Sequence, residues 1–100
     1  MIRWMSTVRI AAGKAVPAMA FAKEMVEFAR KYTGAPQALV FADSFGDAGT
    51  IRFFADYDNL ATFESVSNQM LLDEAYWKRI EEAKDLFIEG SNRTIVMREL

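Results

Sequence analysis

The chain has 100 residues, of which 52% are hydrophobic and 26% are charged, and its formal net charge is −2. That length is typical of one globular domain, so we expect residues 1–100 to form a single domain. A weakly acidic chain lacks the basic face that nucleic acids require, and no apolar run of about 18 residues could span a membrane. Histidine and cysteine are both missing, which excludes the usual zinc and haem ligands and the Ser-His and Cys-His nucleophiles. We expect no metal, no cofactor and a cytoplasmic location.

The first half of the chain predicts a strand followed by a helix. From Ile2 to Ile10, apolar residues occupy alternate positions, a period of two that is typical of a half-buried strand. From Pro17 onward, apolar residues recur at spacings of three and four, which predicts an amphipathic helix. Pro17 suits the first helical turn, where its missing amide hydrogen is not needed. Gly34 and Pro36 then predict the end of this helix.

A hairpin is predicted next, because strand-like segments at Gln37–Phe45 and Thr50–Tyr57 flank the turn-forming residues 46–49. With a loop of four residues, the numbers of two facing residues would add up to 95. A shift by one residue would exchange the two faces of the strand, so this register is testable. The opposed pairs would be Val40 with Ala55, Ala42 with Phe53, Phe41 with Phe54, and Asp43 with Arg52.

The last part of the chain predicts helical structure and one more strand. Asp58 and Asp73 are predicted N-caps, and either two helices or one kinked helix would fit the pattern between them and Gly90. Thr94–Leu100 is predicted to be the final strand. The resulting β-α-β-β-α-β order predicts an α+β, ferredoxin-like sandwich: a four-stranded antiparallel sheet of order 4-1-3-2 with both helices on one face.

The face of the sheet that the helices leave uncovered is too apolar for a monomer. Soluble monomers rarely expose a contiguous apolar patch larger than a few hundred Å². A second copy of the chain, related by a two-fold axis, would cover this face with the same face of its own sheet. We therefore predict a homodimer. The residues assigned to this face are Met5, Thr7, Leu39, Phe41, Phe45 and Phe54.

Charged residues on the predicted strands allow two interpretations. In the first, Asp43–Arg52 and Arg3–Asp56 are ion pairs that fix the register of the sheet or the dimer. In the second, an unpaired guanidinium of Arg9 or Arg52 lines a pocket between two sheets and holds an anionic or enolic ligand. The candidate ligand-binding residues are Met5, Arg9, Asp43, Arg52 and Phe54, and no catalytic residue is assigned.

Aromatic side chains could instead line a pocket for an aromatic ligand, although core packing is the commoner role for such residues. Met25 and Met70 lie on apolar helix faces and are likewise expected to fill the core. The aromatic candidates are Trp4, Tyr57, Tyr76 and Trp77.

The segments Leu60–Glu64, Glu74–Trp77 and Leu86–Ser91 resemble parts of the dimeric α+β barrel superfamily, which includes NIPSNAP-like proteins and antibiotic-biosynthesis monooxygenases. The resemblance implies a homodimer with a cavity between helices and sheet or inside the joint barrel. Members include cofactor-independent monooxygenases, isomerases and cyclases acting on aromatic substrates. Others bind haem, which the lack of histidine disfavours here.

The sequence is compatible with three functions. The chain could bind a small aromatic or anionic ligand, catalyse a cofactor-independent reaction of the monooxygenase, isomerase or cyclase type, or form a purely structural dimer with a filled barrel. A cavity of a few hundred Å³ with convergent polar groups would favour the first two functions.

Overall fold

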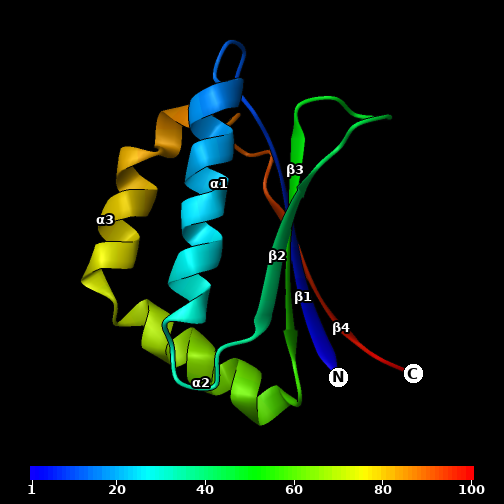
Figure 1. Cartoon of the computed structure of the whole chain (residues 1–100), viewed down its shortest axis with the longest axis vertical. Coiled ribbons are helices and arrows are strands. Elements are labelled where there is room, and N and C mark those ends of the chain that lie inside the picture. The colour runs from blue at the N-terminus through cyan, green and yellow to red at the C-terminus, as the bar shows by residue number, and fades with distance from the viewer.

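The structure, a computed structural model, describes all 100 residues and shows the predicted arrangement of a sheet with helices on one side only (Figure 1). No helix combines the length and the hydrophobicity that crossing a membrane would require. The elements in chain order are β1 (Ile2–Arg9), α1 (Ala15–Arg30), β2 (Gln37–Ala42), β3 (Thr50–Tyr57), α2 (Leu60–Leu71), α3 (Glu74–Glu82), a short 3₁₀ helix (Lys84–Leu86) and β4 (Arg93–Arg98).

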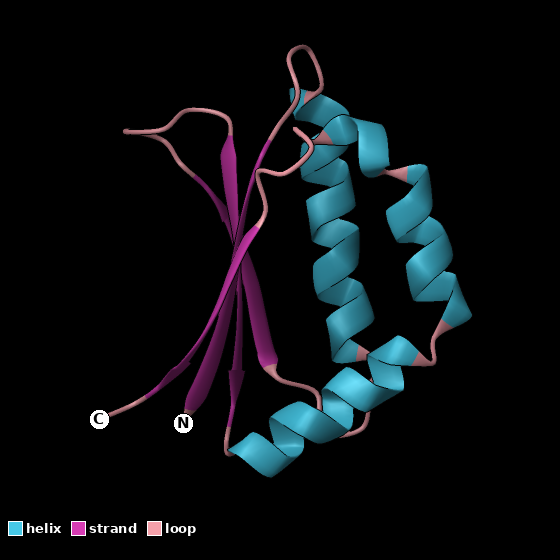
Figure 2. Cartoon of the chain, turned by 180° about the vertical axis from the view of Figure 1, so that it is seen from behind, coloured by secondary structure: helices cyan, strands magenta, loops and turns pink.

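The sheet has the order β2-β3-β1-β4, and all neighbouring strands are antiparallel. This confirms the predicted order and the ferredoxin-like α+β fold. The two chain ends lie at the same end of the sheet, as the view from behind also shows (Figure 2). In both views the β2–β3 loop and the C-terminal end of β4 reach away from the helices.

The predicted hairpin register is wrong by two residues. Phe54 faces Leu39 rather than Phe41, and Phe41 faces Arg52. Because the shift is even, every strand residue keeps its predicted face. The alternation that fixed the faces could not distinguish these two registers, since both place the same side chains on the same side.

The hairpin loop is longer than the predicted four residues, because β2 ends at Ala42 and β3 begins at Thr50. The amide of Thr50 donates a hydrogen bond to the carbonyl of Asp47 over 3.2 Å, which closes the loop on itself. Gly46 has a φ of 93°, a conformation that residues with a side chain rarely adopt. Phe45 therefore lies in the loop, 97% exposed, and not on the sheet as predicted.

The helical region between β3 and β4 forms two separate helices, and one of its two predicted N-caps is corrected. Asp73 caps α3 as predicted, since its Oδ1 accepts hydrogen bonds from the amides of Ala75 and Tyr76. The cap of α2 is Asn59, not Asp58. Its Oδ1 accepts from the Thr62 amide at 2.9 Å, and its backbone is extended, as an N-cap requires.

The helical part also ends earlier than predicted, at Glu82 rather than near Gly90. The 3₁₀ helix then turns the chain back toward the sheet, where Phe87 packs on Phe21 of α1 with ring centroids 5.6 Å apart. The apolar residues beyond Glu82 therefore continue the helical spacing in the sequence, although the helix itself has ended.

The core lies between the helices and the sheet in two small clusters, and only 14 of 100 residues are buried in the isolated chain. A hydrophobic fraction of 52% therefore leaves many apolar groups outside the core. The clusters comprise Val8, Ala18, Ala22 and Ile51 in the first, and Ala55, Tyr57 and Val66 in the second.

Candidate functional site

A cleft of about 780 Å³ opens between the helices and the sheet. It exists because α1 packs on β2 and β3, whereas no helix packs closely on β4, whose six residues are all exposed. The floor is formed by β1 and β3, and α3 with the segment after it forms the outer wall. Its apolar and aromatic lining includes Trp4, Phe21, Met25, Phe53, Tyr76 and Ile80.

The wall formed by α3 is fixed to α1 rather than to the sheet. Arg79 of α3 makes a bidentate ion pair with Glu24 of α1, with distances of 2.7 and 3.1 Å. The Tyr32 hydroxyl donates to Asp73 Oδ2 at 2.7 Å, and this bond holds the pKa of Asp73 below its usual range. These two contacts lie near opposite ends of α3, so they set how far α3 stands from β4.

One end of the cleft carries a small polar cluster formed by Ser6, Asn92 and Thr94. The Thr94 hydroxyl donates to Asn92 Oδ1 at 3.1 Å, and Asn92 Nδ2 donates to Ser6 Oγ at 3.2 Å. Ser6 is 3% exposed, so its hydroxyl sits at the base of an otherwise apolar surface. Sequence reasoning missed this cluster, because Ser6 and Asn92 are 86 residues apart; a serine on the apolar face of β1 was the available signal.

Two aromatic residues contribute further polar groups to the cleft. Tyr32 and Trp77 form side-chain hydrogen bonds elsewhere, but the Tyr76 hydroxyl and the Trp4 indole N–H have no hydrogen-bond partner within the chain. Burial raises the pKa of Tyr76, so its phenol stays a neutral donor near pH 7. The cleft therefore offers donors near its walls and a hydroxyl–amide cluster at its base.

The charges at the mouth of the cleft favour uncharged or cationic ligands over anions. Lys84, Asp85 and Glu89 line this region. The Lys84 ammonium is 2.9 Å from a carboxylate oxygen of Glu81, which offsets its charge, whereas Asp85 and Glu89 form no ion pair. An anion entering here would approach carboxylates without a free cation nearby.

The sequence-predicted site residues lie on the other face of the sheet, which we call the open face. The pairing of the strands places four apolar residues side by side across the sheet: Leu39, Phe54, Met5 and Ile95. These residues form an apolar row through the middle of the open face. Phe41 packs edge-to-face on Phe54, with ring centroids 5.6 Å apart. Met5 and Phe54 are thus direct neighbours, and Ile95 of β4 is an addition that the sequence-based assignment did not include.

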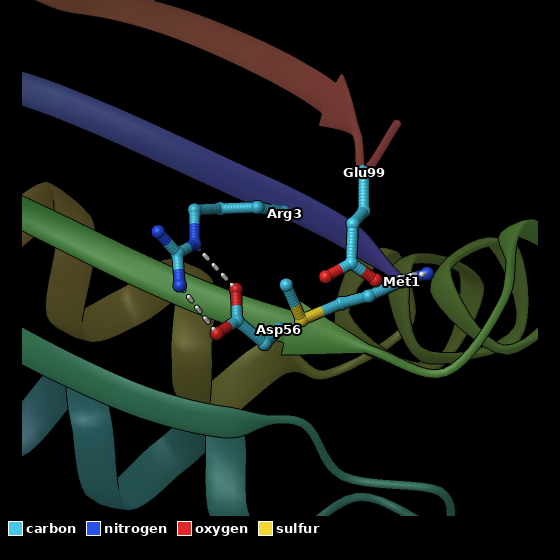
Figure 3. Close-up of polar contacts among 4 residues, drawn as sticks. All are labelled: Met1, Arg3, Asp56 and Glu99. Atoms are coloured by element: carbon cyan, nitrogen blue, oxygen red, sulfur yellow. Dashed lines mark hydrogen bonds and ion pairs between the residues drawn. The ribbon is translucent and has the colours of Figure 1, made fainter.

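Both predicted ion pairs are present and flank the apolar row. Arg52 binds Asp43 through two hydrogen bonds of 2.9 and 3.0 Å. Arg3 binds Asp56 through two hydrogen bonds of 2.7 and 2.9 Å, which Figure 3 shows. Each hydrogen-bonded guanidinium lowers the pKa of its carboxyl partner. Arg52 is therefore not the free cation that the second interpretation required.

Arg9 lies at the end of β1, opposite Thr50, and its guanidinium forms no ion pair or hydrogen bond within the chain. Its backbone amide donates to Ser91 Oγ. Arg93, opposite Thr7, likewise has no carboxylate partner and donates to the backbone carbonyls of Gly90 and Asn92. The structure thus brings together four of the predicted residues as two contacting pairs and leaves Arg9 apart from them.

No protein-family model matches this sequence, and no curated protein matches it. Solved structures match closely in fold. A NIPSNAP domain protein from Burkholderia xenovorans has a TM-score of 0.81 at 15% identity, covering 100% of this chain and 95% of that one. A NIPSNAP family protein of unknown function from Agrobacterium tumefaciens has 0.78 at 17%, covering 99% and 87%. An antibiotic biosynthesis monooxygenase has 0.77 at 14%, covering 100% and 99%. These similarities confirm the predicted resemblance at the level of the fold.

Proposed function

We propose that this chain, which has the fold of the NIPSNAP and antibiotic biosynthesis monooxygenase structures, is a homodimeric protein that binds a small, uncharged aromatic molecule. The observation that carries the proposal is the cleft of about 780 Å³ between helices and sheet. Ligand sites in proteins are commonly clefts of this size with an apolar lining and a few convergent polar groups.

The lining of the cleft supports an aromatic ligand with one or two hydrogen-bonding groups. Trp4, Phe53 and Tyr76 offer ring faces and edges for stacking. The Ser6–Asn92–Thr94 cluster can exchange hydrogen bonds with a carbonyl or hydroxyl, and the Tyr76 phenol can donate another. A phenol, quinone or similar uncharged ring system fits this combination, and the carboxylates at the mouth disfavour its anionic counterpart.

The homodimer is supported by the chemistry of the open face. An apolar row crosses all four strands there, with Leu39 42% exposed in the isolated chain. The flanking arginines already have bidentate carboxylate partners, so a second copy could cover them without burying an unpaired charge. The β2–β3 loop and the end of β4 reach beyond this face on the side away from the helices (Figure 2). A second copy of the same face is self-complementary about a two-fold axis.

We propose binding rather than catalysis because the cleft presents hydrogen-bonding groups but no residue with an assigned acid, base or nucleophilic role. Cofactor-independent turnover is the alternative, and oxygen uptake would detect it. The chain would be incubated with naphthoquinols and catechols in air, and oxygen uptake above the uncatalysed rate would move the proposal from binder to enzyme.

Two single-tryptophan variants test the binding site directly. Trp77→Phe leaves Trp4, which lines the cleft, as the fluorescent reporter, and Trp4→Phe leaves Trp77, which does not line it. Titration with menadione, an uncharged naphthoquinone, should quench the Trp77→Phe variant saturably and leave Trp4→Phe with collisional quenching only. The sulfonated analogue should bind more weakly. Equal, non-saturating quenching of both variants would contradict the proposal.

A further inference from the structure

A second, smaller pocket of about 150 Å³, called the inner cavity below, lies between the helices and the sheet and is partly open to solvent. Of its 14 lining residues, 13 are hydrophobic, and Ser67 of α2 is the exception. Ala29 on α1 and Ala38 on β2 contribute small side chains to the lining. Met25 and Met70, expected from the sequence to fill the core, border this space instead.

The inner cavity adjoins the cleft. Four residues line both spaces: Trp4, Met25, Phe53 and Tyr76. A ligand stacked on these rings in the cleft would therefore lie beside the inner cavity. Met25, which borders both spaces, is unbranched and flexible, so its side chain can change rotamer without moving the backbone.

The size and lining of the inner cavity indicate which chemical group it can hold. Protein interiors are normally packed as densely as organic crystals, so unfilled apolar space weakens packing. An apolar cavity of about this volume can accommodate benzene, which has six carbon atoms. Each methylene moved from water into such a space improves affinity about fourfold. Ser67 alone offers too little polarity to favour a charged or strongly hydrated group.

We propose that the inner cavity receives an apolar substituent of the aromatic ligand, a short alkyl chain or phenyl group of up to about six carbon atoms. The inference rests on the proposed function and narrows it to ring systems that carry a hydrogen-bonding group on one side and an apolar arm on the other. The ring occupies the cleft, and the arm passes between Met25 and Tyr76 into the space beside Ala29 and Ala38.

The test is a calorimetric titration with para-alkylphenols from methyl to octyl. Affinity should rise about fourfold per methylene until the arm has about six carbons, and then stop rising. Ala38→Leu fills the inner cavity and should remove most of the gain while leaving para-cresol binding unchanged. Ala20→Leu, the same change at an exposed position of α1, should keep the full chain-length dependence. If Ala38→Leu does not fold, Ala29→Leu fills the cavity from the helix side.

The outcomes separate this inference from the proposed function. Binding of para-cresol with no dependence on chain length overturns the inference and leaves the proposed function standing. A rise that continues to octyl, or that survives both cavity-filling variants, also overturns it. If neither an alkylphenol nor menadione binds, the proposed function fails, and xenon-pressurised crystals of the unmodified chain then test the cavity by itself. Xenon beside Ala38 and Met25 supports an apolar receptor space, and water there contradicts it.

Discussion

One face of the sheet is covered by helices and the other is not, and β3 has residues on both faces. Ile51 and Ala55 point toward the helices and are buried, while Phe54 between them points away and stays partly exposed. On the helix face, intramolecular packing forms the core and leaves a cleft over β1 and β3. On the open face, an apolar row lies between bidentate ion pairs. Both faces of the sheet therefore carry apolar residues, and the helices cover only one of them.

Phe54→Arg is expected to have the largest effect, on the open face. The new cation would sit in the apolar row beside Arg3, whose guanidinium is now 5.6 Å from the Phe54 ring centroid, and would meet its own copy near the axis. The dimer dissociation constant should rise roughly 30-fold or more, as for a central interface hot spot. Leu72→Arg, at a position that is 83% exposed at the C-terminal end of α2, is the matched control. A dimer of unchanged affinity in the first variant would show that the wrong face was assigned.

Ile51→Ala tests the helix face by comparison. Ile51 is 1% exposed in the larger core cluster, so its truncation should cost about 2–5 kcal/mol of unfolding free energy. Leu39→Ala, made in the monomeric Phe54→Arg background, should cost about 1 kcal/mol or less, because that side chain is already partly in water there. Urea unfolding of the two truncations, each made in the Phe54→Arg background, gives the comparison. Equal losses would mean that the two faces are packed alike.

Tyr32→Phe is expected to loosen the wall of the cleft. It removes the hydroxyl that donates to Asp73 at the start of α3, a loss of about 1 kcal/mol, and should increase hydrogen exchange in α3. Tyr57→Phe is the matched control, since the Tyr57 hydroxyl forms no hydrogen bond within the chain. Indistinguishable results for the two variants would show that the Tyr32–Asp73 bond does not hold α3.

Acid should weaken the two ion pairs of the open face. The pKa values of Asp43 and Asp56 are lowered in the folded chain, first of all by hydrogen bonds from Arg52 and Arg3. Their contribution to stability is therefore complete above the ordinary Asp pKa of about 4 and is lost as pH falls below it toward the lowered values. Unfolding measured at pH 7 and pH 3 should show a smaller loss for the Asp43→Asn/Asp56→Asn variant than for the unmodified chain. A loss of equal size would place the acid sensitivity elsewhere.

The smallest expected effect concerns anions at the Arg9 end of the open face. Arg9 and Arg93 have no carboxylate partner there, so sulfate should raise the melting temperature more than chloride at equal ionic strength. Arg9→Ala should remove this difference. Arg98→Ala is the control, because Arg98 is also unpaired but lies opposite Ile2 at the far end of the sheet. Sulfate stabilisation that survives Arg9→Ala would show that Arg9 does not bind the anion.

Most of the fold was predictable because local periodicity encodes it. Strand alternation assigned the faces and the two ion pairs, and helical spacing with Asp73 located α3. The hairpin register was not predictable, since a shift of two residues leaves every face unchanged. Asp58 and Asn59 can both cap a helix, and the backbone conformation selected Asn59.

The cleft was not predictable from the sequence for a different reason. Its width depends on where α3 stands, and this is set by contacts such as Arg79–Glu24 between residues 55 positions apart. The polar cluster likewise joins Ser6 to Asn92 across the sheet. Trp4 and Tyr76 were recognised as candidate pocket residues, but no periodicity distinguishes an aromatic that lines a cleft from one that fills a core.

The mass of the unmodified chain in solution tests most directly whether the open face is covered by a second copy. Sedimentation equilibrium at low micromolar concentration should give twice the chain mass of 11.3 kDa. A stable species of 11.3 kDa at that concentration, with the row of Leu39, Phe54, Met5 and Ile95 in water, would contradict the account.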